Sequence, residues 1–169
     1  ELVIIENIVD TYRNSGVCED GNMEWFLADF SVYETLNPDK SVLTEEQKQA
    51  ALDKLIEKVI ESEDKPSNLA KAIIALRAMG YDARKVFTKD GEAIDLVEKL
   101  TALIDDKNSG VTNIYTLPYV LIALQQGEDY LEEDKESFLI ESAIANKDSW
   151  TEYGVDGATM MMLALAPYV

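Results

Sequence analysis

The chain has 169 residues, of which 47% are hydrophobic, 33 are acidic and 15 are basic, so its formal net charge is −18. This length and hydrophobic content allow one folded domain with a substantial core and exclude a disordered chain. The negative charge disfavours phosphate backbones and anionic lipids, and no apolar run approaches about 18 residues, so we expect neither nucleic-acid binding nor membrane insertion.

Residue types that carry much enzyme chemistry are scarce. Histidine is absent and Cys18 is the only cysteine, which excludes Ser-His and Cys-His arrangements, most zinc sites and an internal disulfide. Acidic clusters near Asp20 and Glu132 lack the ligand spacing of a calcium loop. We therefore expect no catalytic residue, no metal and no cofactor. The length predicts a single domain over residues 1–169. Because the sequence begins at Glu1, we expect this domain to be a fragment of a longer or processed chain.

Helical periodicity runs along the whole chain, and no comparable β-pattern is present. We expect eight helices, paired as four hairpins, at about residues 2–13, 23–36, 44–61, 69–80, 92–106, 117–127, 134–145 and 156–167. The third helix has the clearest start, because Thr44-Glu-Glu-Gln47 is a capping box. Gly80 is expected to cap the fourth helix, and Asp156 is expected as the N-cap of the eighth.

One pattern is repeated in three of these segments, and each copy contains an Ala-Leu pair. The pairs are Ala75-Leu76, Ala123-Leu124 and Ala164-Leu165. Leu27-Ala28-Asp29 aligns with Leu69-Ala70-Lys71 as a degenerate fourth copy. The spacing of one helix pair between copies is typical of stacked-helix proteins.

The repeated helices are apolar nearly all round, whereas the helices between them have one charged face. A helix that is apolar on every side is buried on every side, so this alternation predicts two layers, an inner row backed by an outer row. The expected fold class is therefore all-α. Met160, Met161 and Met162 are expected to lie in the helix core, because three consecutive residues do not share one helical face. An adaptable apolar surface is the alternative for them.

The segments 70–82, 117–127 and 154–168 resemble the helix-hairpin repeats of the terpenoid cyclase and protein prenyltransferase superfamily. They are most similar to squalene-cyclase-like repeat domains of bacterial surface proteins, over about residue 25 to the C-terminus. The resemblance implies an α/α toroid, in which inner helices ring a cavity and outer helices wrap them. About four hairpins would form a partial or open toroid. It also implies an extracellular or cell-surface location.

The catalytic motifs of that superfamily are missing from this chain. It has no Asp-x-Asp-Asp acid of the cyclases, no Asp, Cys and His set for the zinc of the prenyltransferases, and no Cys-Gly-Glu-Gln thioester run. The segment 146–150 only echoes the Gln-x-x-Asp-Gly-x-Trp brace of the cyclases, and we interpret it as a structural remnant.

Aromatic residues near the starts of inner helices are the candidate ligand-binding residues, because Tyr and Trp bring large contact area and a polar group. The segment 150–156 is the strongest candidate, because aromatic, acidic and glycine residues meet in a loop before an inner helix. Core packing and loop anchoring are the alternative roles. The candidates are Trp25, Tyr33, Tyr81, Tyr115, Tyr119, Trp150, Tyr153 and Asp156, together with Arg77.

Arg77 interrupts an apolar inner helix, so it is expected either to pair with a carboxylate or to face the cavity as a ligand anchor. Asp29 or Glu34, on the neighbouring inner helix, is the expected partner.

We expect a non-catalytic binding or interaction module, which uses the concave face or the rim loops to bind a small molecule or a protein. Three alternatives stay open. A carrier of a bulky small molecule, resembling cobalamin carriers, requires a wide cavity lined by Tyr and Trp. A terpenoid-processing enzyme requires a buried carboxylate of raised pKa facing an apolar cavity. A structural spacer has neither a cavity nor a binding patch.

Overall fold

The structure is a computed structural model that describes residues 7, 10, 11, 23–152 and 154–169. Seven α-helices and one two-stranded sheet lie within these residues, so the expected all-α character is confirmed apart from the small sheet. The helices are α2 (Met23–Leu36), α3 (Glu45–Glu61), α4 (Pro66–Ala78), α5 (Leu96–Ala102), α6 (Leu117–Leu124), α7 (Glu133–Ala145) and α8 (Gly154–Leu165). Short 3-10 turns η2 (Lys147–Ser149) and η3 (Ala166–Tyr168) flank α8. The helix expected at 2–13 lies largely outside the described residues.

The capping box predicted for α3 is present. The Gln47 amide donates to Thr44 Oγ1 at 3.2 Å, and the Thr44 amide donates to Gln47 Oε1 at 2.9 Å. Two of the free backbone N–H groups at this helix end are therefore satisfied by side chains. The local sequence alone fixes where α3 begins.

The end of α4 is a Schellman motif that is built around Gly80. This glycine has a φ of +84°, a conformation that L side chains rarely adopt. The Gly80 amide donates to the Arg77 carbonyl at 3.0 Å, and the Tyr81 amide donates to the Leu76 carbonyl at 2.9 Å. The helix begins earlier than expected, at Pro66, because proline is well suited to the first turn.

The helix expected at 92–106 is shorter than predicted. Ala93–Ile94 is strand β2, which pairs antiparallel with β1, Val86–Phe87. Helix α5 starts only after Asp95, whose side chain accepts a hydrogen bond from the Glu98 amide at 2.8 Å. Pairing with strand β1 thus overrides the local helical periodicity at Ala93, which is exposed.

Helix α8 also differs from expectation. It begins at Gly154, so Asp156 lies in its first turn rather than at its N-cap. Only Met161 and Ala164 of α8 are buried, whereas Met162 is 66% exposed. The prediction that every repeated helix is buried on all sides is therefore wrong for α8, and the prediction of core positions for the three methionines holds only for Met161.

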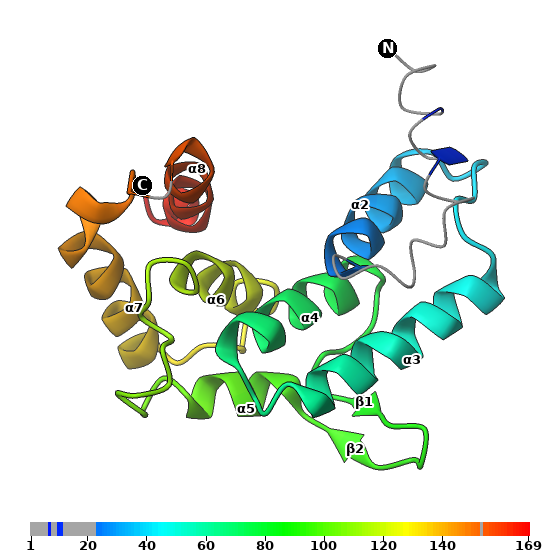
Figure 1. Cartoon of the computed structure of the whole chain (residues 1–169), viewed down its shortest axis with the longest axis horizontal. Coiled ribbons are helices and arrows are strands. Elements are labelled where there is room, and N and C mark those ends of the chain that lie inside the picture. Colours follow the sequence, from blue (N-terminus) through cyan, green and yellow to red (C-terminus); the bar gives the residue numbers. More distant parts are fainter. Residues whose placement is uncertain (1–6, 8–9, 12–22, 153) are drawn as a thin grey trace.

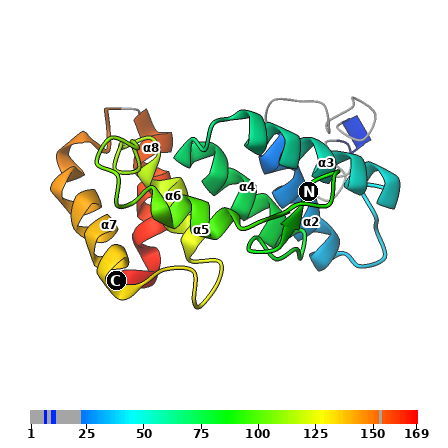
Figure 2. The ribbon, with the colours of Figure 1, turned by 90° about the horizontal axis from the view of Figure 1, so that it is seen from below.

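The even-numbered helices lie side by side in chain order, as α2 against α4, α4 against α6, and α6 against α8. The odd-numbered helices lie along the outside of this row, where α3 and α5 pack against α4, and α7 packs against α6 (Figure 1). Helices α2 and α8 stand at the two ends of the row, and no helix of the described residues lies between them above α4 and α6, a region that we call the open space (Figure 1). Figure 2 shows the same order from below, with α4 and α6 between the two ends.

One hydrophobic core runs through the described helices. Its fully buried members come chiefly from α4 and α6, and include Leu69, Ile73, Leu117, Leu121 and Leu124. These two helices occupy the middle of the row and are covered on both sides and from outside, which leaves the open side as the surface where their polar and aromatic residues meet solvent.

Candidate functional site

The candidate residues fall into separate groups in the structure. Trp25, Tyr115, Tyr119 and Asp156 lie at or just before the starts of even-numbered helices, as predicted. Tyr33 and Tyr81, which were also expected at helix starts, instead lie near the end of α2 and just after the end of α4, respectively, so that part of the prediction is wrong.

The best-formed cluster joins three helices of the row. The rings of Trp25 on α2 and Tyr119 on α6 have centroids 5.7 Å apart and are tilted by 54°. Lys71 Nζ, from α4 between them, lies 5.1 Å from the centroid of the Tyr119 ring. Such a distance is typical of a cation–π interaction. All three side chains are half-buried, so the cluster is both ordered by contacts and reachable from solvent.

This cluster lies on the open side of the row. Helices α2 and α6 are both neighbours of α4, so a contact between their side chains has to cross over α4. The opposite side of α4 is occupied by α3 and α5 (Figure 1). The Trp25–Tyr119 contact therefore crosses α4 on the side that faces the open space.

An apolar band continues from the cluster, one helical turn further along each helix. Alignment of the repeated segments gives Lys71, Tyr119 and Met160 one shared position, and a second shared position lies three residues later, on the same helical face. Residues at the second position are half-buried in the two central helices and more than half exposed at the two ends. They are Val32 at 53%, Ile74, Ile122 and Leu163 at 58%. We call these four, together with Trp25, Lys71, Tyr119 and Met160, the inner surface.

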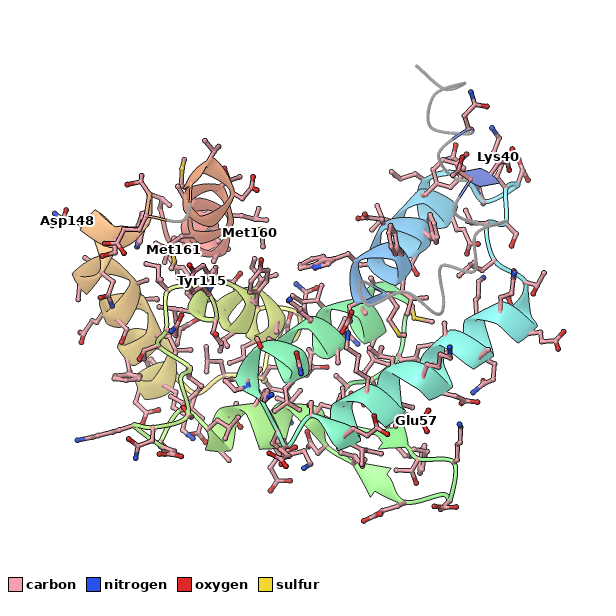
Figure 3. The ribbon with its side chains drawn as sticks, viewed as in Figure 1. Lys40, Glu57, Tyr115, Asp148, Met160 and Met161 are labelled. Carbon is pink, nitrogen blue, oxygen red and sulfur yellow. The ribbon has the colours of Figure 1, made fainter. Side chains whose placement is uncertain are left out.

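Two neighbouring methionines of α8 lie in different environments, one in the core and one on the inner surface. Met161 is 1% exposed and points down among α6 and α7, whereas Met160 lies on the side of α8 that faces the open space (Figure 3). The sequence could not divide the three methionines in this way, because their environment depends on which helices stand beside α8.

Trp150 has a structural position rather than an open one. Its Nε1–H donates to the Ala143 carbonyl at 3.0 Å, and its ring packs against the core. It thus anchors the 146–152 turn to the end of α7, as in the alternative role foreseen for it. Tyr153 lies outside the described residues, and Asp156 is exposed on the first turn of α8.

Arg77 does not pair with either expected carboxylate. Its guanidinium Cζ lies 6.0 Å from the Tyr130 ring centroid, and its Nη1 donates to the Tyr81 carbonyl at 3.4 Å. Arg84 lies 5.2 Å from the same ring and also pairs with Asp129. Burial raises the pKa of Tyr130, and the nearby Arg77 charge opposes that rise. Arg77 therefore joins α4 to the loop after α6 instead of facing the open space.

Glu34, one of the expected partners of Arg77, instead pairs with Lys48 and accepts hydrogen bonds from backbone amides. Its carboxylate lies 2.9 Å from Lys48 Nζ and accepts the Val42 amide at 2.7 Å. Burial by itself would raise the pKa of Glu34, but the hydrogen bonds from Lys48, Val42 and Leu43 bring it below its ordinary value of 4.5. The same pair, with Tyr81, lines a pocket of about 450 Å³ at the ends of α2 and α4. Asp29, aligned with Lys71, is partly desolvated, which raises its pKa.

Two features of the folded chain were not predicted from the sequence. Lys71 was not singled out, although aligning the repeats places it at the position of Tyr119. Glu24 is 4% exposed and lies 2.6 Å from Lys58 Nζ on α3, which makes it a buried ion pair between two helices. No local sequence signal joins residues 34 positions apart, so only the folded chain reveals this pair.

Polar side chains also gather in a second pocket, of about 270 Å³, between α5 and the loop before α7. Its wall includes two cations, Arg84 and Lys135, and each already has a carboxylate partner. Arg84 pairs with Asp129, which also lines the pocket, and Lys135 pairs with Asp105. Across the described ranges, no group of three or more His, Cys, Asp or Glu side chains is placed to hold a metal ion. No helix among those described is long and apolar enough to span a bilayer.

Comparison of the chain with models of protein families, with curated proteins and with solved structures finds no match.

Proposed function

We propose that this chain is a non-catalytic binding module, in which the inner surface of the even-numbered helices holds an apolar ligand, either a protein segment or a bulky small molecule. The observation that carries the proposal is the Trp25–Lys71–Tyr119 cluster, which three helices build together on the open side of the row. The resemblance to squalene-cyclase-like repeats supports a partial α/α toroid as the architecture and a bacterial cell-surface or secreted location.

The chemistry of the inner surface suits an apolar partner with an aromatic group. Val32 and Leu163 stay more than half exposed at the two ends of the band, so apolar area is available for burial at about 25 cal/mol per Å². Trp25 and Tyr119 offer large rings whose contact with a partner costs little conformational entropy. Lys71 is the one cation in the cluster, in a chain whose net charge is −18.

The test uses the fluorescence of Trp25 as the reporter. A library of amphipathic peptides and of polycyclic small molecules is titrated against the W150F variant, which leaves Trp25 as the only tryptophan. We expect hits that shift Trp25 emission and that bind at least tenfold more weakly to Y119A and K71A. The matched control is F87A, which removes an aromatic side chain 51% exposed on β1.

Two outcomes would contradict the proposal. One is a library without hits, and the other is a set of hits whose affinity is unchanged in Y119A and K71A. If all hits are small molecules, the carrier function is favoured over protein binding.

A further inference from the structure

Helix α8 exposes an apolar residue, Met162, at a position that is fully buried in α4 and α6. Met162 is 66% exposed, whereas the residues aligned with it by the Ala-Leu pairs, Ile73 in α4 and Leu121 in α6, are both 0% exposed. The same position of the repeat is therefore buried in α4 and α6, which are each followed by another helix of the row, and exposed in α8.

Met162 belongs to a continuous stripe along α8. Val155, Thr159 and Met162 are spaced by four and three residues along α8, so they share one helical face, and Ala166 follows in η3. All four are exposed, and Val155 is 81% exposed. We call this stripe the end face.

The structure shows what covers the same stripe in the other helices. In the row, α6 packs against α4 and α8 packs against α6, and the residues aligned with Met162 in α4 and α6 are fully buried. Gln125, which aligns with Ala166, donates from Nε2 to the Ala164 carbonyl of α8 at 2.7 Å. The aligned stripe of α6 is thus in direct contact with α8.

The composition of the end face is that of an interior helix. Residues 154–169 carry one charged side chain, Asp156, although the whole chain has 33 acidic residues. Repeats that close a helical array present a polar outer face to water. The end face instead presents the uncharged side chains of Val155, Thr159, Met162 and Ala166, of which three are apolar.

We propose that the end face is a docking surface for a further α-helix, which lies along α8 as α8 lies along α6. The chemistry of that helix is set by the residues with which α8 meets α6, Met161 at 1% and Ala164 at 0% exposure. It presents one aliphatic and one small side chain three residues apart, with no acidic group between them. This proposal does not depend on ligand binding at the inner surface.

The test extends the whole chain with a helix of that chemistry. Residues 166–169 are replaced by a second copy of residues 125–169, so that a copied α7–α8 pair follows α8 through the same connection that follows α6. In a C18S background, M162C in the first copy reports exposure of the end face through its rate of reaction with a thiol reagent. We expect the extension to slow this reaction at least tenfold.

Two controls make the result specific. I60C replaces a residue 53% exposed on α3, far from α8, and its reaction rate is expected to be the same in both chains. Aspartates in place of the copied Met161 and Ala164 are expected to restore the fast reaction of M162C. An unchanged M162C rate on extension, or protection that survives the aspartates, overturns the proposal.

Sedimentation of the unextended chain tests whether a second copy of this chain covers the end face instead. A dimer that is lost in M162K would assign the end face to a second copy of this chain and would overturn the proposed helix. A monomer over the accessible concentrations, together with protection in the extended chain, is the result that supports the proposal.

Discussion

At the scale of single residues, Glu34 joins three parts of the chain. Its carboxylate accepts hydrogen bonds from Lys48 on α3 and from the Val42 and Leu43 amides in the connection between α2 and α3. Hydrogen bonds to a charged acceptor are stronger than those between neutral groups. The charged form of Glu34 therefore stabilises the fold, and this is why its pKa is lowered despite partial burial.

E34Q is expected to lower the free energy of unfolding at pH 7 by about 1–3 kcal/mol, because it leaves these donors with a weaker acceptor. A carboxyl group whose pKa is lowered on folding stabilises the protein above its unfolded pKa, and this contribution is lost as the pH falls through the folded pKa. The difference between wild type and E34Q should therefore shrink below the ordinary value of 4.5.

Urea unfolding at neutral pH and at about pH 3 measures this difference. E46Q, which changes an exposed carboxylate in the first turn of α3, is the matched control and should change little at either pH. If the free energy of unfolding differs between wild type and E34Q by the same amount at both pH values, the charge of Glu34 is not what stabilises the fold.

At the scale of elements, the ends of the helices differ in how far side chains define them. Helix α3 has a complete capping box at Thr44, whereas Thr116, at the N-cap of α6, makes no capping hydrogen bond with its side chain. The start of α6 depends on Pro118 in the first turn and on packing between α4 and α8.

Replacing each threonine with alanine separates these two mechanisms. T44A is expected to destabilise the protein by about 1 kcal/mol, because it leaves a backbone N–H of α3 without its side-chain acceptor. T116A is expected to change stability by less than about 0.5 kcal/mol, as surface substitutions without such a feature do. Thermal or urea unfolding measures both, and equal losses in the two variants would contradict the role of the capping box.

At the scale of the whole molecule, the charge of −18 opposes the compact state. The ion pairs Lys99–Asp64 and Lys135–Asp105, at 2.8 and 2.9 Å, lie in partly exposed positions where such pairs contribute little. The 33 acidic side chains outnumber the 15 basic ones, and the less exposed pairs Glu24–Lys58 and Glu34–Lys48 are screened little by salt, so we expect repulsion among the acidic groups to dominate the response to salt.

We expect the urea midpoint to rise when NaCl is increased from about 0.02 to about 0.5 M, because salt shortens the range of this repulsion. The same series with KCl separates screening from a specific effect of sodium. A midpoint that falls with salt would mean that the ion pairs stabilise the protein more than the net charge destabilises it.

The sequence by itself determined most helix positions, because the signals that set them are local. The capping box at Thr44 and the glycine at Gly80 each act within one turn, and both predictions are confirmed. The helix expected at 92–106 is present but begins only at Leu96, because strand pairing with Val86–Phe87 is not encoded in the periodicity of that segment. Alternation of apolar and amphipathic helices indicated two kinds of helix. The predicted burial is nearest in α4 and α6, which have a neighbour on both sides, but Lys71, Ile74, Tyr119 and Ile122 stay half-buried there.

Only the tertiary structure decided which candidate residues meet. Trp25 and Tyr119 come together because α2 and α6 both pack on α4, and Arg77 reaches Tyr130 because the loop after α6 returns beside α4. Contacts of this kind depend on helix–helix packing across tens of residues, whereas caps and periodicity depend on neighbours within a few residues. The binding role of the candidates stays a prediction, and the exposed stripe on α8 became visible only once its aligned positions were seen buried in α4 and α6.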